Sequence, residues 1–265
     1  MNAAPYQAVF FDIDGTLVSH RTGSIPQSAK ETLLALHERG VRLFVSTGRH
    51  ISEIRRLAGV LDFPWDGLIT LNGQYCFDGK TPYYAQAIEP EDVARLVRRS
   101  RELQIPCKFV EEESMYVSAH TDVVRRVQAD IHTPLPELGD LSHGLTHPVY
   151  LVVTYCTPTQ QKELLAPLGH VRSTIWNPFA FDVIHEDGSK ENGVRMTCRR
   201  YGIPLERAMA FGDGENDADM LRCVGMGIAM GNGAEVAKKA ARFVTRDIDE
   251  DGVAWAVRRF GLLPG

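Results

Sequence analysis

The sequence predicts an α/β protein, with a Rossmann-like doubly wound parallel sheet as its core and an α+β domain inserted into it. Short apolar segments alternate with helical patterns at both ends of the chain, which is typical of a parallel sheet with crossover helices. The middle of the chain instead holds several short segments of alternating polarity, typical of strands. The 265 residues, 44% of them hydrophobic, are enough for about two domains with buried cores.

The N-terminal segment has a β-α-β-α-β pattern. Pro26 begins a helical pattern and Gly40 is placed to end it, following the preference for proline at helix starts and glycine after helix ends. The expected order is a strand over 8–12, the helix after Pro26, a strand over 41–46, a helix near 52–58 and a strand over 68–71.

The pattern then changes. Residues 74–77 and 83–86 flank Asp78-Gly79-Lys80-Thr81-Pro82, which indicates a hairpin. Residues 89–103 form a strongly amphipathic helix with arginines outside its apolar stripe. We expect further strands and one more helix here, the strands over 107–110, 115–118, 148–155, 171–176 and 179–185 and the helix over 158–168.

The parallel pattern returns towards the C-terminus. A helix over 190–200 ends at Gly202, and the elements after it are a strand over 208–211, a helix over 216–222, a strand over 227–230 and helices over 234–241 and 252–260. The two ends of the chain therefore resemble each other and the middle looks inserted. We predict one core built from residues 1–82 and 187–265, with residues 83–186 as a second domain.

Composition excludes several classes of protein. The chain has 29 Lys and Arg against 34 Asp and Glu, a formal charge of −5, which argues against a nucleic-acid-binding protein. No apolar run approaches the ~18–20 residues that span a bilayer, so we expect no membrane partner. The chain's start lacks a signal-peptide pattern, and its five cysteines include no CxxC, so we expect free thiols and a cytoplasmic location.

Two carboxylates stand at the end of the first predicted strand. In an extended backbone residues i and i+2 point to the same side, so Asp12 and Asp14 can face one site. Paired carboxylates repel unless a cation lies between them, and oxygen ligands suit Mg²⁺. The pair also suits a nucleophile beside a proton carrier. An ordinary Asp-Gly turn is the alternative.

Two other polar clusters follow predicted strands. In Ser46-Thr47-Gly48-Arg49, Gly48 allows close approach of an anion and Thr47 offers a hydroxyl donor, although a helix cap would use the same residues. Gly212-Asp213-Gly214-Glu215-Asn216-Asp217 is rich in oxygen ligands, although a capped turn is again an alternative.

Other motifs fail. A Walker A loop would need a glycine where Gln74 stands, and the dinucleotide-binding, EF-hand, HExxH and GxSxG patterns are not matched.

Taken together, the chain resembles the haloacid dehalogenase-like (HAD) phosphatase superfamily, and within it the Cof-type hydrolases with a large inserted α/β cap. The resemblance extends over nearly the whole chain, through Phe11-Asp12-Ile13-Asp14-Gly15-Thr16-Leu17, Ser46-Thr47-Gly48-Arg49, Leu71-Asn72-Gly73, Ser189-Lys190, Gly212–Asp217 with Met220-Leu221, and Asp251-Gly252-Val253. It implies that residues 1–82 and 187–265 are the catalytic core and that 83–186 is a substrate-specificity cap.

The resemblance also implies a phosphoryl-transfer site. Asp12 would attack phosphorus and become an aspartyl phosphate, while Asp14 would protonate the leaving oxygen and then activate water. Mg²⁺ would be held by the Asp12 carboxylate, the Asp14 backbone carbonyl and Asp213, and Asp217 would orient metal-bound water or the ligands.

The phosphate-binding residues that the resemblance implies are Thr47, the backbone N–H groups of Ile13 and Gly48, Lys190 and Asn216. Donors at strand ends and the charge of a lysine would neutralise the negative charge that spreads over the transferring group. Arg49 belongs to the Thr-Gly-Arg motif of the family, but the resemblance assigns it no contact.

These observations predict a Mg²⁺-dependent phosphatase of small phosphorylated metabolites, with sugar phosphates expected first. A phosphotransferase or phosphomutase acting on sugar phosphates is the second hypothesis, and a non-catalytic protein that binds a phosphorylated metabolite is the third. We expect a small phosphate ester as the only partner, and a monomer or weak homodimer.

Overall fold

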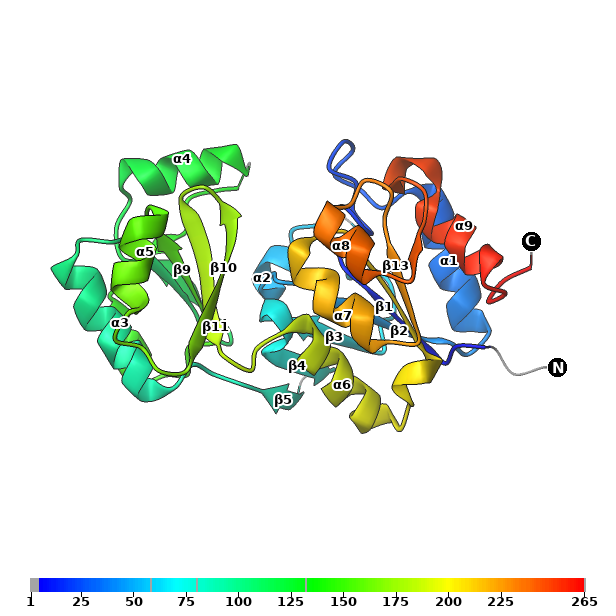
Figure 1. Cartoon of the computed structure of the whole chain (residues 1–265), viewed down its shortest axis with the longest axis horizontal. Coiled ribbons are helices and arrows are strands. Elements are labelled where there is room, and N and C mark those ends of the chain that lie inside the picture. The colour runs from blue at the N-terminus through cyan, green and yellow to red at the C-terminus, as the bar shows by residue number, and fades with distance from the viewer. Residues whose placement is uncertain (1–4, 58, 80, 132, 265) are drawn as a thin grey trace. The chain divides into compact units, whose positions relative to one another are not determined.

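The computed structural model describes residues 5–57, 59–79, 81–131 and 133–264. The chain divides into two compact units, Met1–Ala85 with Ser189–Gly265, and Gln86–Gly188 (Figure 1). The first boundary lies three residues after the predicted one, because β5 (Thr81–Ala85) pairs with β4 (Tyr75–Asp78) and so belongs to the first unit. The second lies two residues later than predicted, just before the helix that begins at Lys190.

The first unit contains an eight-stranded sheet in the order β14-β13-β12-β1-β2-β3-β4-β5. The six strands from β14 to β3 are parallel, five of them predicted as such, and the β4–β5 hairpin adds two antiparallel strands at one edge. The remaining bounds are β1 (Ala8–Phe11), β2 (Arg42–Ser46), β3 (Gly67–Thr70), β12 (Ala208–Gly212), β13 (Met226–Ala229) and β14 (Phe243–Val244).

Helices cover both faces of this sheet (Figure 1). On one face Phe11 packs in a cluster with Leu33 of α1 (Gln27–Glu38) and Val257 of α9 (Gly252–Arg259). On the other, Phe10 packs in a cluster with residues of α6 (Lys190–Tyr201), α7 (Ala218–Cys223) and α8 (Glu235–Ala240). Burial on both faces explains why the strands are apolar without alternation.

Some elements differ from the prediction. Helix α2 (Ile51–Ile54) is shorter than the predicted 52–58, and Ala58 lies outside the described residues. The helix predicted over 216–222 is a 3₁₀ turn, Glu215–Asp217, followed by α7. Strand β14 was not predicted, because two residues carry no readable pattern.

The second unit is an antiparallel-rich α+β domain. Its six-stranded sheet has the order β10-β11-β9-β6-β7-β8, with bounds β6 (Cys107–Val110), β7 (Met115–Val117), β8 (Glu137–Leu138), β9 (Leu151–Tyr155), β10 (Val171–Asn177) and β11 (Ala180–His185). Its core joins β6 and β11 to α3 (Pro90–Glu102) and α5 (Pro158–Leu165) through Phe109, Phe181, Leu96 and Leu164.

The prediction of two helices in this unit was wrong, since α4 (Asp122–Asp130) is a third. The buried residues of α4 are Val124, Val127 and Gln128, whose i, i+3, i+4 spacing is typical of a helix, so the sequence did carry a signal for it. Gln128 Nε2 donates a hydrogen bond to the Tyr155 hydroxyl of β9, 3.0 Å away.

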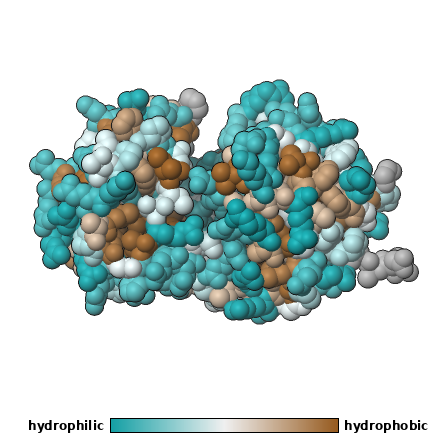
Figure 2. All heavy atoms as spheres, viewed as in Figure 1, coloured by the Kyte–Doolittle hydropathy of each residue, from teal (hydrophilic) through white to brown (hydrophobic). Residues whose placement is uncertain are grey.

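The surface carries few large apolar side chains. On the face drawn in Figure 2, hydrophobic residues form separate patches among hydrophilic ones on both units. Exposed leucines such as Leu34 and Leu138 are ordinary on a protein surface. No helix among the described residues is long and apolar enough to cross a membrane. The five cysteines are free thiols in this structure, four of them buried and Cys223 partly so.

Candidate functional site

The predicted site residues gather at the carboxyl ends of three neighbouring parallel strands. Asp12 follows β1, Thr47 follows β2 and Asp213 follows β12, with β1 in the middle. The backbone N–H of Asp12 donates to Phe211 O at 3.0 Å, which extends the ladder to the site. This edge of an open α/β sheet is where ligands bind.

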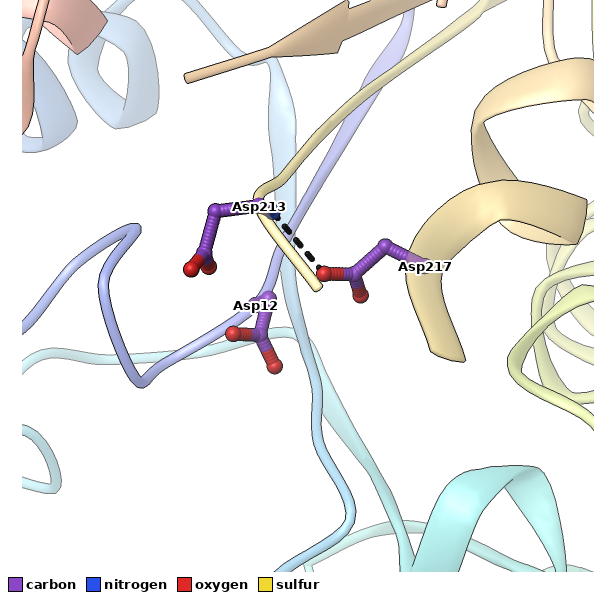
Figure 3. A group of neighbouring side chains, drawn as sticks. All are labelled: Asp12, Asp213 and Asp217. Atoms are coloured by element: carbon purple, nitrogen blue, oxygen red, sulfur yellow. Dashed lines mark hydrogen bonds between the residues drawn. The ribbon is translucent and has the colours of Figure 1, made fainter. Parts of the chain in front are cut away.

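Three carboxylates form an acidic cluster there. One oxygen from each of Asp12, Asp213 and Asp217 lies within 4.8 Å of the others, and in Figure 3 the three side chains converge. Asp217 is fully buried, Asp12 is nearly so and Asp213 is partly exposed. The side chain of Asp14 is not part of this cluster. This agrees with the resemblance, which assigns only the backbone carbonyl of Asp14 to the metal.

Lys190 is buried beside this cluster. Its Nζ lies 2.5 Å from Asp12 Oδ1 and 2.6 Å from Asp217 Oδ1, and its side chain has no exposed surface. It is the first residue of α6, after the N-cap Ser189, as predicted. A lysine at a helix N-terminus is disfavoured by the helix dipole, and a buried ammonium group is costly unless paired. The two carboxylates provide that pairing.

Hydrogen bonds fix the remaining oxygens of the acidic cluster unequally. Asp217 Oδ2 accepts the backbone N–H groups of Asp213 (2.9 Å, dashed in Figure 3) and Gly214 (2.8 Å). Its Oδ1 accepts from Lys190, so both oxygens are engaged. Asp213 Oδ1 accepts the Thr16 hydroxyl at 2.8 Å. Within the described residues, Oδ2 of Asp12 and Oδ2 of Asp213 accept no hydrogen bond. These two oxygens are therefore the ones available to a cation.

Crowding of negative charge changes the acidity of the cluster. Burial raises the pKa of Asp12 well above its usual value, and Asp217, Asp213 and Asp14 raise it further, while Lys190 opposes them. Burial and the Asp217 charge raise the pKa of Asp213 to about 6. Burial alone would lower the pKa of Lys190, but Asp12 and Asp217 raise it above its ordinary value. Lys190 is therefore a fixed positive charge.

Asp14 pairs with Arg49. The guanidinium donates two hydrogen bonds, from Nε to Asp14 Oδ2 and from Nη2 to Oδ1, both 2.7 Å long. These bonds raise the pKa of Arg49. A bidentate pair of this kind fixes the orientation of the carboxylate as well as its charge. Sequence reasoning gave Arg49 no contact, and the structure supplies one.

The predicted phosphate-binding groups flank the cluster. The backbone N–H groups of Ile13 and Gly48 donate no hydrogen bond to any described residue, so both are available to an anion. Thr47 is buried, and its Oγ1 accepts the N–H of Arg49 at 3.1 Å. Asn216 is exposed, with its Nδ2 donating to Asn72 Oδ1 at 3.0 Å.

Two residues with structural contacts to the site were not given roles from the sequence. Asn72, part of the Leu71-Asn72-Gly73 motif, contacts Asn216. Asn232 bridges two loops: its Nδ2 donates to Gly15 O at 2.7 Å and its Oδ1 accepts the N–H of Ile248 at 2.9 Å. The signal for Asn232 was an asparagine between two glycines directly after a predicted strand.

The charges present fit a divalent cation. Among the described residues, two cationic side chains, Lys190 and Arg49, form ion pairs with this group of four carboxylates (Asp12, Asp14, Asp213 and Asp217), so two negative charges are uncompensated when all ionise. Carboxylate oxygens are the ligands that Mg²⁺ prefers. The donor set therefore fits this ion.

Comparison with known proteins supports the same conclusion. A family model described as haloacid dehalogenase-like hydrolase matches residues 9–257. The putative phosphatase YkrA of Bacillus subtilis is 31% identical over 260 residues, which cover 96% of this chain and 98% of that protein.

Solved structures agree over nearly the whole chain. The sugar phosphatase BT4131 of HAD subclass IIB matches with a TM-score of 0.88 and 37% identity, over 97% of this chain and 100% of that one. BT1666 of Bacteroides thetaiotaomicron, a phosphatase of the same superfamily, has a TM-score of 0.89 and 28% identity, over 97% of this chain and 96% of its own. This chain therefore belongs to the haloacid dehalogenase-like hydrolase family, as its motifs predict.

Proposed function

We propose that the protein is a Mg²⁺-dependent phosphatase that hydrolyses small phosphorylated metabolites through an aspartyl phosphate on Asp12. One observation carries the proposal: buried Lys190 lies between Asp12 and Asp217, with Asp213 beside them, at the carboxyl ends of β1 and β12. Because a buried cation and a group of carboxylates are costly to assemble, their presence at a ligand-binding edge indicates chemistry on a charged substrate.

In the proposed first step, an oxygen of Asp12 attacks phosphorus while the bond from phosphorus to the ester oxygen breaks. A proton from Asp14 passes to that leaving oxygen, so the products are a free alcohol and phosphorylated Asp12. Lys190 holds Asp12 in place and offsets negative charge on the phosphoryl oxygens. The N–H groups of Ile13 and Gly48, with Thr47 and Asn216, orient the remaining oxygens.

In the second step, Asp14 accepts a proton from water, and the water oxygen attacks phosphorus. The bond from phosphorus to Asp12 breaks, which releases inorganic phosphate and restores the carboxylate. Arg49 uses one lone pair on each Asp14 oxygen, which leaves the second lone pair of each oxygen for the proton that Asp14 gives and takes.

The cation site follows from the same contacts. Asp12, Asp213 and the backbone carbonyl of Asp14 would hold Mg²⁺, and Asp217, whose oxygens are already engaged, would act by orienting Asp213 and Lys190. When bound, Mg²⁺ neutralises charge on the transferring phosphoryl group. The unit Gln86–Gly188 would act as the specificity cap, and sugar phosphates are the first substrates to test, since BT4131 is a sugar phosphatase.

The test is phosphate release from p-nitrophenyl phosphate and a panel of hexose and pentose phosphates, with Mg²⁺ or with a chelator. We expect release that depends on Mg²⁺ and is faster with a sugar phosphate than with the aryl ester. Phosphate that appears on an added acceptor sugar instead of in water would make the protein a phosphotransferase. Tight binding without any turnover would make it a non-catalytic binding protein.

A further inference from the structure

Between β3 and β4 the chain makes a left-handed turn over Leu71, Asn72 and Gly73, hereafter the 71–73 turn. The φ angles of these residues are 52°, 55° and 88°. Two consecutive non-glycine residues in this region are uncommon; asparagine tolerates it, but leucine does not adopt it without strain. Both side chains are buried, Leu71 at 2% exposure and Asn72 at 6%. A strained turn that persists must be held by its surroundings.

The loop after β2 holds one side of the 71–73 turn. The N–H of Leu71 donates to Arg49 O at 3.3 Å, and the N–H of Asn72 donates to Thr47 O at 3.0 Å. The Asn72 carboxamide lies against Gly48: a Cβ built on Gly48 would come within 3.0 Å of Oδ1 and 3.2 Å of Nδ2. Any side chain at Gly48 would therefore displace this amide.

A second segment meets the same amide. Asn72 Oδ1 accepts a hydrogen bond from Asn216 Nδ2, 3.0 Å away, although the two residues are 144 positions apart in the chain. Asn216 is otherwise exposed in a short 3₁₀ turn. A free side chain of this kind would sample several rotamers, so the hydrogen bond restricts where its amide lies.

A third segment meets the turn through glycine. A Cβ built on Gly73 would overlap the carbonyl of Ser189 and approach Gly193 N to 3.2 Å. The turn thus packs against the first turn of α6, where Lys190 begins. The proposed function assigns three side chains to the phosphate, those of Thr47, Lys190 and Asn216. The 71–73 turn contacts all three segments that carry them.

We infer that Asn72 is a positioning residue for phosphoryl transfer: its carboxamide sets the place of Asn216 relative to the Thr47-Gly48 loop. This inference rests on the proposed function, and Asn72 acts through these neighbours instead of touching the reacting atoms. Donors stabilise a transition state only when they are fixed close to the productive geometry, and a displacement of about 1 Å costs on the order of a hundredfold in rate.

Two substitutions separate positioning from stability. Asn72→Gly removes the carboxamide but suits the left-handed backbone, whereas Asn72→Ala removes it and keeps the strain. We therefore expect Asn72→Gly to unfold at a higher temperature than Asn72→Ala. Because both lack the carboxamide, both should lose kcat/KM for p-nitrophenyl phosphate by the same factor, roughly ten- to a hundredfold. Inhibition by inorganic phosphate, with Mg²⁺ saturating, should weaken in parallel.

Two further variants complete the experiment. Gln104→Gly is the matched control, since Gln104 is also left-handed (φ 54°) but exposed and in the other unit; it should leave kcat/KM unchanged. In the double variant Asn72→Gly/Asn216→Ala, the loss should be no larger than that of the more damaging single change, since both act through one contact.

The inference is overturned if Asn72→Gly keeps kcat/KM and phosphate inhibition within about twofold of the unmodified protein. It is also overturned if the losses follow the unfolding temperatures of the two variants, if neither variant folds, or if the double variant shows the full product of the single losses. These outcomes require an active unmodified protein. Absence of any turnover by that protein, or full activity of Asp12→Asn, would instead count against the proposed function.

Discussion

At the scale of single residues, the site is defined by which carboxylate oxygens are already engaged. Asp217 has both oxygens in hydrogen bonds, whereas Asp12 and Asp213 each keep one oxygen without a partner among the described residues. Burial and mutual repulsion raise the pKa of Asp12 and of Asp213, so the cluster carries its full charge at neutral pH only at a cost in stability. A bound cation removes that cost.

The effect of Mg²⁺ on stability tests this reading. Mg²⁺ at about a hundred times its Kd stabilises the folded protein by about 2.7 kcal/mol, so the unfolding temperature should rise. Asp213→Asn should abolish that rise because it removes a ligand, whereas Asp219→Asn, which removes only an exposed pair with Arg222, should keep it. Thermal unfolding with and without Mg²⁺ measures both. An equal Mg²⁺ response in Asp213→Asn would show that the ion binds elsewhere.

The positions of the carboxylates could be predicted from the sequence, but the side chains that pair with them could not. Asp12 and Asp213 were predictable because neighbouring parallel strands end at one edge, and the chemistry of that edge follows from the residues after each strand. The Asp14–Arg49 pair was not, because it depends on side-chain rotamers of residues 35 positions apart. The left-handed conformation of Leu71 was equally hidden, since leucine carries no local signal for it.

At the scale of elements, the two units differ in how plainly the sequence shows them. Strands buried on both faces, such as β1 and β12, are continuous apolar runs and were predicted to within a residue. Helix α4 was missed although its buried residues have helical spacing, whereas β8 and β14, at two residues each, are too short to carry a pattern. Pairing of β5 with β4, not any change in composition, sets the domain boundary.

A buried aspartate fixes α3 within its unit. Asp92 accepts the N–H of His170 at 2.8 Å and that of Gly169 at 3.1 Å, and it pairs with Arg95 at 2.8 Å. Burial would raise the pKa of Asp92, but these hydrogen bonds outweigh it and lower the pKa below 3.8. A carboxyl whose pKa is lowered on folding stabilises the protein above its unfolded pKa, and the contribution is lost as pH falls through the folded value.

We therefore expect Asp92→Asn to destabilise the second unit by about 1–3 kcal/mol at pH 7, since it weakens hydrogen bonds to a charged group. The difference from the unmodified protein should stay constant above pH 5 or so and shrink below pH 3.8. Urea unfolding at several pH values measures it. Glu91→Gln, at an exposed pair with Arg95, is the control and should cost less than about 0.5 kcal/mol. A pH-independent difference would contradict this account.

At the scale of the whole molecule, each unit has its own sheet and its own core, two buried clusters in the first unit and one in the second. The second unit is one continuous segment, Gln86–Gly188, whereas the first is assembled from the segments before and after it. An insertion of this kind leaves the core's topology intact, which is why the parallel pattern could be recognised on either side of it.

The fragment 86–188 should therefore fold by itself. Its size is within the usual range of domains, and its core residues, such as Leu96, Phe109 and Phe181, all come from the fragment. We expect one cooperative thermal transition with a native-like circular dichroism spectrum and dispersed NMR signals. A fragment that lacks a cooperative transition would show that this unit depends on the rest of the chain.

The central claim is that Asp12 carries the phosphoryl group during turnover, and trapping that species tests it most directly. Asp14→Asn should slow hydrolysis of the intermediate, because no carboxylate is left to accept a proton from water. After mixing with p-nitrophenyl phosphate and Mg²⁺ and quenching in acid, mass spectrometry of peptides should find one phosphoryl group on Asp12. Its absence from Asp12→Asn/Asp14→Asn is the control. A phosphoryl group on another residue, or hydrolysis by Asp12→Asn at the unmodified rate, would contradict the account.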